Sequence, residues 1–264
     1  MPTALDLDAY FARIRWAGDR TPTLATLGGL LRAHVSNIPF ENLDVLLGRG
    51  VKIDLPSIEA KLVRARRGGY CFEHATLFDA VLEAIGFQPV RHAARVVLFT
   101  PLHAAPRTHM FLTVTVEGAT FVVDPGFGPF ASLAPVPLAD GATGPHRMVR
   151  DGARWTLQVP RDGQTVDAWV TTLEVENPID FAVANHFVAT HPESPFVNLL
   201  MLSAVTPDGR VNVMNRDVTI LREGRAQTAQ ISDRAALRAL LATRFGFDLP
   251  EAERLVVPAI PDWR

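Results

Sequence analysis

The spacing of apolar and polar residues changes near residue 89, and this change divides the chain into a helical part and a part built mainly from strands. Before residue 89, apolar residues recur every three or four positions, which is the period of one helix face. The pattern predicts four helices, over residues 5–14, 23–34, 57–66 and 72–85. Residues 38–44, between the second and third of these helices, are expected to form a loop with an exposed Phe, Glu and Asn.

Short runs of β-branched and aromatic residues replace the helical pattern after residue 89. Strands are predicted over residues 96–99, 111–116, 120–123, 155–159 and 169–173, since glycine and proline separate these runs as they separate strands. The last third predicts strands over residues 199–205, 211–214, 218–221 and 227–231. A helix then follows an N-cap at Ser232 and ends near Gly246. This order predicts an α+β fold with a small barrel or sandwich in its middle.

Composition places the chain among ordinary globular proteins. Its 264 residues are 48% hydrophobic, and 26 basic residues nearly balance 28 acidic ones. This balance gives no sign of nucleic-acid or membrane-surface binding. The first residues do not have the pattern of a signal peptide, and no apolar run is long enough to span a membrane. With one cysteine and therefore no internal disulfide, the expected compartment is the cytoplasm.

The single cysteine, Cys71, is the strongest candidate for chemistry. Gly68 and Gly69 precede it, and the fourth predicted helix begins directly after it. A sulfur at a helix N-terminus is favoured as thiolate by unpaired N–H groups and by the helix dipole. The alternative is a small buried core residue, which is what most free cysteines are.

A nucleophilic cysteine needs a base and a group that orients the base. His74 follows on the same predicted helix but has no obvious carboxylate beside it. His109 begins a predicted strand, and a turn at residues 117–118 would pair residue 116 with 119. Asp124 then becomes the diagonal neighbour of His109 on one sheet face, about 7–8 Å away. Cys71, His109 and Asp124 can therefore form a triad, although Asp124 could instead simply start a turn before Pro125.

Five separated motifs resemble those of the arylamine N-acetyltransferases and occur in the same order. The family's active-site signature is matched by residues 67–74, and its second signature by His34 with residues 38–44. Residues 108–109 and 124–128 resemble the segments that carry the family's histidine and aspartate. Residues 184–185 and 190–196 resemble a further motif. Two positions depart from the family pattern: Ala75 stands where Asn is usual, and Pro125 where a small or β-branched residue is usual.

The resemblance implies three domains: a helical bundle over residues 1–88, a β-barrel over 89–190 and an α/β lid over 191–264. It implies a cysteine-protease-like triad in which Cys71 is the nucleophile, His109 the base and Asp124 the orienting group. It further implies that Phe40 and Phe127 line the acceptor pocket. Phe196 is expected to contact the coenzyme or to close the cleft.

The resemblance also implies the reaction. Acetyl-CoA, used as co-substrate without a metal, would acetylate Cys71, and an arylamine, arylhydrazine or N-hydroxyarylamine would then take the acetyl group. The partners are thus small molecules, with no nucleic acid or membrane, and the protein is expected to be a monomer or homodimer. Two related activities stay open: an amide synthase acting on polyketide-type acyl chains, and a papain-like or transglutaminase-like thiol hydrolase. A non-enzymatic binding protein with a structural Cys71 is the alternative outside enzymes.

Overall fold

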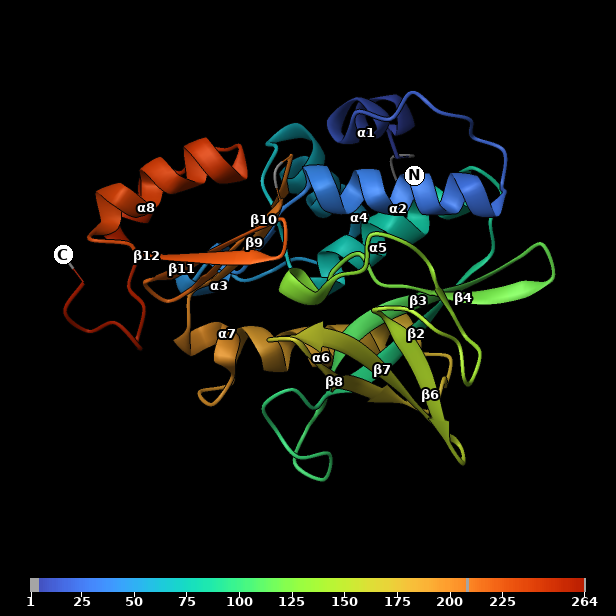
Figure 1. Cartoon of the computed structure of the whole chain (residues 1–264). Coiled ribbons are helices and arrows are strands. Elements are labelled where there is room, and N and C mark those ends of the chain that lie inside the picture. Colours follow the sequence, from blue (N-terminus) through green and yellow to red (C-terminus); the bar gives the residue numbers. More distant parts are fainter. Residues whose placement is uncertain (1–4, 208, 264) are drawn as a thin grey trace.

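The computed structural model describes residues 5–207 and 209–263, and its N-terminal part is helical, as the sequence predicts (Figure 1). Asp6 starts the first helix and Thr23 the second, each by accepting a hydrogen bond from a backbone N–H three residues later. Such caps satisfy donors that a helix start leaves unpaired. The helices are α1 (Leu7–Ile14), α2 (Leu24–Asn37), α3 (Leu43–Leu46), α4 (Leu55–Ile58) continued by a π-helical turn (Glu59–Arg64), and α5 (Cys71–Ala84).

The expected exposed loop over residues 38–44 is wrong. The segment contains the short strand β1 (Phe40–Glu41) and the start of α3, and the side chains of Glu41 and Asn42 are buried. Glu41 is buried because Arg67 binds its carboxylate, and Asn42 because its amide hydrogen-bonds three backbone groups of residues 196–201. These partners lie far away in the sequence, so no local pattern reveals them.

A seven-stranded antiparallel sheet follows, in the order β5-β4-β3-β2-β8-β7-β6. Its edge strands β5 and β6 contact each other, so the sheet curls into a nearly closed barrel. This confirms an α+β fold with a barrel-like sheet. The strands are β2 (Pro89–Val96), β3 (Arg107–Val116), β4 (Ala119–Val123), β5 (Val136–Pro137), β6 (Arg147–Asp151), β7 (Arg154–Arg161) and β8 (Gln164–Thr171), with a 3-10 turn (Gly128–Phe130) after β4.

The C-terminal part is built on a second antiparallel sheet, in the order β1-β9-β10-β11-β12. Two hairpins supply four of its strands, and β1 joins them from the N-terminal part by pairing with β9. The predicted helix after these strands begins one residue later than expected, with Asp233 as its N-cap. The elements are α6 (Pro178–Thr190), α7 (Pro195–Asn198), β9 (Met201–Thr206), β10 (Gly209–Met214), β11 (Asp217–Arg222), β12 (Arg225–Gln230), α8 (Arg234–Leu240) with its π-helical end (Leu241–Phe245), and a 3-10 helix (Pro250–Arg254).

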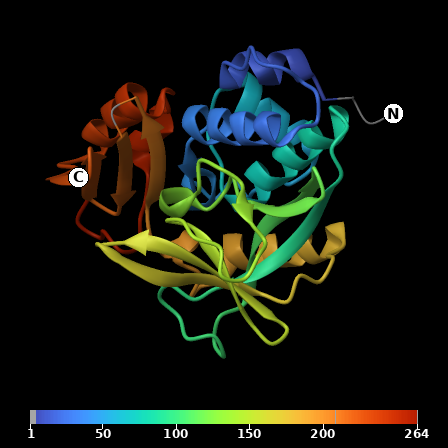
Figure 2. The same cartoon turned by 45° about the vertical axis from the view of Figure 1, so that its right-hand side comes forward.

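Two apolar clusters form the core. The larger one joins the N-terminal helices to the barrel, and the smaller one lies between the second sheet and α8. Figure 2 shows the second sheet beside the helices, with the barrel below them. Within the described residues, no helix is long and apolar enough to cross a membrane. The domain boundaries at residues 88 and 190 stay a prediction.

Candidate active site

Cys71 is the first residue of α5, and close backbone approaches fix the chain on both sides of it. A Cβ on Gly68 would lie 2.2 Å from the carbonyl oxygen of Pro39, and one on Gly126 would lie 2.6 Å from Cys71 Cα. Real side chains do not tolerate such contacts, so only glycine fits at either position. Cys71 itself is 4% exposed. The nucleophile candidate is therefore held between two glycine segments with little free space.

Two backbone N–H groups at the start of α5 lack an acceptor in the described part of the chain. Glu73 and His74 donate their N–H groups to the carbonyl oxygen of Tyr70, but within the described residues those of Cys71 and Phe72 have no acceptor. Two unpaired donors at a helix start can bind an oxyanion.

His109 and Asp124 come from the hairpin of β3 and β4, whose register is the predicted one. Val116 pairs with Ala119 and Leu112 with Val123, so Asp124 follows directly after the end of β4. His109 Nε2 lies 2.7 Å from Asp124 Oδ2, and both side chains are buried. The same carboxylate oxygen accepts a hydrogen bond from Trp169 Nε1 over 3.1 Å. The diagonal pair expected from the sequence is thus in hydrogen-bond contact.

Burial alone would lower the pKa of His109, but the charge of Asp124, its hydrogen bond and the sulfur of Cys71 together raise this pKa to about 10. At neutral pH the ring is therefore an imidazolium. Since Nε2 faces Asp124, Nδ1 is the ring nitrogen that can donate a hydrogen bond to Sγ of Cys71. An imidazolium beside a cysteine favours the thiolate, which is the nucleophilic form.

The three phenylalanines expected at the substrate site lie near these residues. The ring of Phe127 is 4.8 Å from that of His109, measured between centroids. Phe196 lies 5.4 Å from Tyr70 and 6.2 Å from Phe40. The structure therefore groups Phe127 with the imidazole and Phe40 with Phe196, next to the residue that precedes Cys71.

His74, the other candidate base, belongs to a buried chain of hydrogen bonds. Its Nε2 lies 3.2 Å from the carbonyl oxygen of Pro39, and its Nδ1 lies 2.8 Å from His34 Nε2. Because a carbonyl only accepts, His74 donates from Nε2 and accepts at Nδ1; His34 Nδ1 in turn accepts from the hydroxyl of Tyr10, 2.8 Å away. Burial lowers the pKa of His74 to about 4, so this ring stays neutral. Its contacts hold Pro39 in place rather than activating the sulfur.

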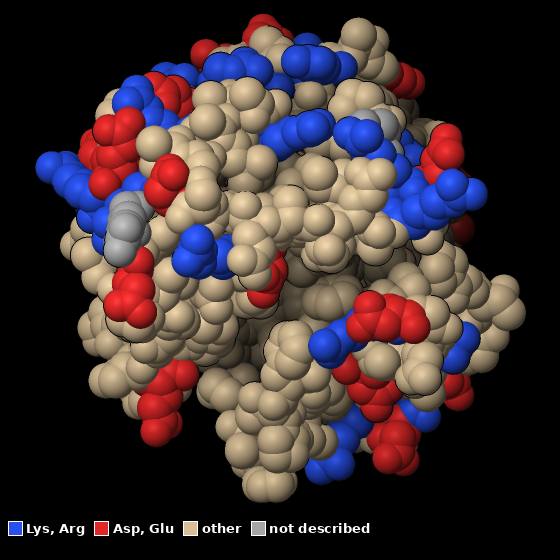
Figure 3. Space-filling model, turned by 60° about the vertical axis from the view of Figure 1, so that its left-hand side comes forward, with Lys and Arg blue, Asp and Glu red and all other residues tan. Residues whose placement is uncertain are grey.

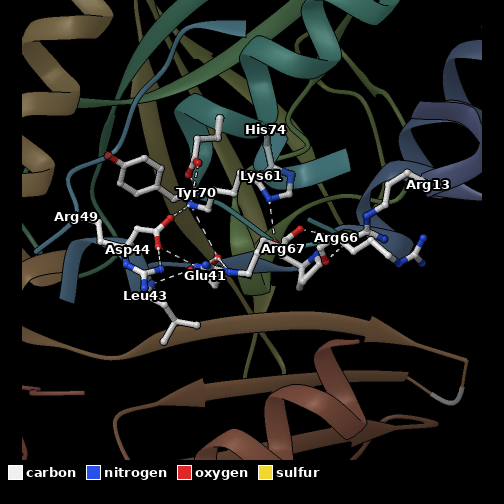
Figure 4. A network of polar contacts seen from close by, with 12 residues as sticks. Arg13, Glu41, Leu43, Asp44, Arg49, Lys61, Arg66, Arg67, Tyr70 and His74 are labelled. Carbon is white, nitrogen blue, oxygen red and sulfur yellow. Dashed lines mark hydrogen bonds and ion pairs between the residues drawn. The ribbon is translucent and has the colours of Figure 1, made fainter. Parts of the chain in front are cut away.

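A charged network, which the sequence analysis did not predict, surrounds the segment that leads to Cys71 (Figure 4). Arg67 Nη2 lies 2.7 Å from Glu41 Oε1, and Lys61 Nζ lies 2.8 Å from both Asp44 Oδ2 and Glu73 Oε1. Glu73 Oε2 also accepts the N–H of Tyr70 over 3.1 Å. The Glu at the third helical position is half of a capping-box pattern. Tyr70 at the cap position concealed this signal, because tyrosine is not among the residues that usually cap helices.

The two departures from the family pattern lie beside the candidate triad. Ala75 is completely buried in the larger core. Oδ1 of Asp124 is buried without a hydrogen-bond partner in the described part of the chain. Pro125, the next residue, has no N–H to offer it.

The chain matches known proteins over most of its length. A protein-family model described as N-acetyltransferase matches residues 23–254. The arylamine N-acetyltransferase of Mycobacterium tuberculosis is 40% identical over 262 residues, covering 94% of this chain and 91% of that protein. The one from Escherichia coli is 36% identical over 254 residues, covering 94% and 90%.

Solved structures of the same kind of protein also match this chain. The structure of Mycobacterium marinum arylamine N-acetyltransferase in complex with CoA matches with a TM-score of 0.88 at 35% identity, covering 94% of both chains. The Mycobacterium smegmatis arylamine N-acetyltransferase structure matches with a TM-score of 0.89 at 37% identity, covering 97% of both chains. Likeness of this extent, in sequence and in fold, shows that the chain belongs to the arylamine N-acetyltransferase family of enzymes.

Proposed function

We propose that the protein transfers the acetyl group of acetyl-CoA to aromatic amines, hydrazines or N-hydroxyarylamines through an acetylated Cys71. The observation that carries this proposal is the 2.7 Å contact between His109 and Asp124, on an imidazole whose neighbouring residue, Thr108, accepts a 3.8 Å hydrogen bond from the sulfur of Cys71 through its carbonyl oxygen. A matching structure was solved in complex with CoA, which supports the choice of acyl donor.

In the first step, the Cys71 thiolate attacks the thioester carbon of acetyl-CoA. The carbonyl oxygen becomes an oxyanion, and the unpaired N–H groups of Cys71 and Phe72 are the nearest donors at the start of α5. The carbon–sulfur bond to coenzyme A then breaks, His109 gives its proton to the departing thiolate, and a thioester on Cys71 remains. One thioester replaces another, so little energy is lost.

In the second step, the amine attacks the acetyl-Cys71 carbonyl carbon. His109, now neutral, accepts the proton that the amine loses, and the bond to Sγ breaks to restore the thiolate–imidazolium pair. Asp124 keeps the ring oriented in both steps and stabilises its positive charge in the acetyl-free enzyme. Phe127 beside His109, together with Phe40 and Phe196, would hold the aromatic acceptor.

The experiment is the intact mass of the protein after incubation with acetyl-CoA alone, for wild type and for Cys71→Ala. We expect one acetyl group on the wild type, none on the variant, and removal of the acetyl group by an added arylamine. Release of free coenzyme A without a stable adduct would instead identify a thiol hydrolase. Formation of the adduct without turnover of small aromatic amines would favour the amide synthase.

A further inference from the structure

A second, strongly basic cleft lies apart from Cys71, between the N-terminal helices and the C-terminal sheet. It has a volume of about 700 Å³ and is bordered by the ends of α1 and α2, by the end of β9 and by residues 243–246. In Figure 1 these helix ends face the region of α8 across the top of the molecule. The volume is within the range of about 300–1,000 Å³ that small-molecule sites occupy.

Four exposed arginines line this cleft without a partner of opposite charge. They are Arg15, Arg32, Arg66 and Arg244. Among the described residues, none of their side chains forms an ion pair or hydrogen bond, and no Asp or Glu lines the cleft. Elsewhere Arg20 binds Asp8 and the half-buried Arg238 binds Asp248, whereas Arg154, Arg225 and Arg254 are exposed and form no ion pair with another described residue. What distinguishes the cleft is that four unpaired arginines line the same hollow.

Buried contacts fix the backbone at two of these arginines, Arg15 and Arg66. Arg13 lies beneath them, and its guanidinium donates to the carbonyl oxygens of Leu62, Asn37, Arg66 and Arg67. This ties the end of α1 to the end of α2 and to the turn at Arg66, and Figure 4 shows Arg13 and Arg66 side by side. A cation that satisfies four carbonyls is fixed in one position.

Arg15 and Arg66 also adopt backbone conformations that glycine would adopt more easily. Their φ angles are 58° and 55°, in the left-handed region. A helix end of this kind usually carries glycine, because a side chain there adds strain. A positive charge near a helix C-terminus offsets part of this strain. That explanation does not cover Arg32, which lies more than a turn before the end of α2.

We propose that this cleft is a binding site for the phosphate groups of a small polyphosphorylated organic anion. Guanidinium groups bind phosphate oxygens through two parallel hydrogen bonds, and four of them in one cleft match a ligand with several phosphates. Bound phosphates would also remove the mutual repulsion of the arginines. On the face drawn in Figure 3, several Lys and Arg side chains lie across the upper half of the molecule, and Asp and Glu side chains lie at the rim of the hollow below them.

Two sources could supply this chemistry. Val35 and Val205 line both the basic cleft and a small inner cavity that reaches Phe40, so the ligand could be the phosphate end of coenzyme A itself. It could equally be a separate phosphorylated metabolite. Only the first source rests on the proposed acetyl transfer.

The test is isothermal titration of the full-length protein with inorganic triphosphate at about 0.1 M salt. The variant is Arg32→Gln/Arg66→Gln, and the control is Arg225→Gln/Arg254→Gln, which removes the same charge from two other exposed arginines. We expect saturable binding by the wild type and the control, and binding at least tenfold weaker in the cleft variant. Absence of saturable binding, or equal binding by both variants, would overturn the proposal.

A second measurement identifies the source: the KM for acetyl-CoA in the acetylation of Cys71. A KM raised about tenfold in the cleft variant alone assigns the site to coenzyme A. An unchanged KM together with lost triphosphate binding assigns it to a separate phosphorylated compound. If the wild type is not acetylated at all, the proposed acetyl transfer fails, while the titration still decides whether the cleft binds phosphate.

Discussion

Trp169 and Asp124 are joined by a hydrogen bond in which the indole Nε1–H donates to the carboxylate oxygen that also faces His109. The indole comes from β8, two strands away from β3 in the barrel, and it is completely buried. Trp169 thus stabilises the charge of Asp124 without touching Cys71, and we class it as a positioning residue.

We expect Trp169→Phe to slow acetylation of Cys71 by about tenfold, since hydrogen bonds to charged groups contribute roughly 1.5–3 kcal/mol and part of the stacking on Phe111 is kept. Stopped-flow measurement of coenzyme A release gives the rate constant. Thermal unfolding of the same variant shows whether the barrel is intact. An unchanged rate constant in a folded variant would contradict the positioning role.

Asp124→Asn removes the charge that contributes most to raising the pKa of His109 to about 10, so this pKa should fall. A larger share of the rings would then be neutral, and the thiolate would lose part of its counter-charge. We expect acetylation roughly 10³- to 10⁴-fold slower, as for the equivalent change in other triads.

Alkylation of Cys71 by iodoacetamide measures the same change directly. The wild type should be alkylated faster than Asp124→Asn at pH 7, and this difference should shrink near pH 10, where the imidazolium of His109 loses its proton. Superimposable pH profiles would rule out this account of the ion pair.

Gly126→Ala should destabilise the protein and distort the nucleophile segment, because the new Cβ would lie 2.6 Å from Cys71 Cα and 3.1 Å from its carbonyl oxygen. Overpacking of this kind costs about 1–3 kcal/mol. Gly28→Ala is the matched control: Gly28 lies inside α2, and its new Cβ would meet only Pro135, at an ordinary contact distance of 3.5 Å. We expect that control to gain up to about 1 kcal/mol from helix propensity. Urea unfolding compares the two, and equal stabilities would refute the steric argument.

Arg67→Met should cost about 3–5 kcal/mol of unfolding free energy, because it leaves the buried carboxylate of Glu41 without its closest partner. Arg49→Met is the control, since Arg49 binds Asp44 and Glu251 at the surface and such pairs contribute about 0–1 kcal/mol. Adding Glu41→Gln to Arg67→Met should recover part of the loss. Additive losses in the double variant would show that the two side chains do not interact.

Glu73 should make stability depend on pH between about 4.5 and 7. Burial raises the pKa of Glu73 to about 7 despite the charge of Lys61, whereas the unfolded chain releases this proton near 4.5. The contribution of Glu73 to the free energy of unfolding is therefore complete below pH 4.5 and is lost as the pH rises to about 7. The free energy of unfolding falls by at most about 1.4 kcal/mol per pH unit in this range.

Glu73→Gln should make the free energy of unfolding depend less on pH between about 4.5 and 7. Glu83→Gln, which changes an exposed residue of the same helix, should leave this dependence as in the wild type. Urea unfolding at several pH values measures both slopes. Equal slopes for wild type and Glu73→Gln would assign the pH dependence to other groups.

The hairpin that carries His109 and Asp124 could be predicted because its geometry is local. Glu117 and Gly118 both have positive φ, 54° and 78°, which is the two-residue turn that preserves the alternation of side chains. A loop with an even number of residues determines which residues of the two strands share a face. Counting from this turn therefore predicts that His109 and Asp124 lie on the same face.

The contacts that the sequence did not reveal join segments far apart in the chain. β1 pairs with a strand about 160 residues later, and Trp169 reaches Asp124 across the barrel. A two-residue strand has no periodicity to detect, and Glu41 and Asn42 have the polarity of loop residues. Their burial depends on partners that only the folded chain brings near.

The strand β1 also determines how the molecule can come apart. Glu41 N–H binds the carbonyl oxygen of Gly69 while Phe40 and Glu41 pair with β9, so two residues fasten the C-terminal sheet to the backbone just ahead of Cys71. A chain ending before β9 would leave this strand as an open edge, able to recruit other chains. Heat or denaturant that loosens the C-terminal sheet should therefore inactivate the nucleophile in the same transition, and we expect that neither half of the chain alone acetylates Cys71.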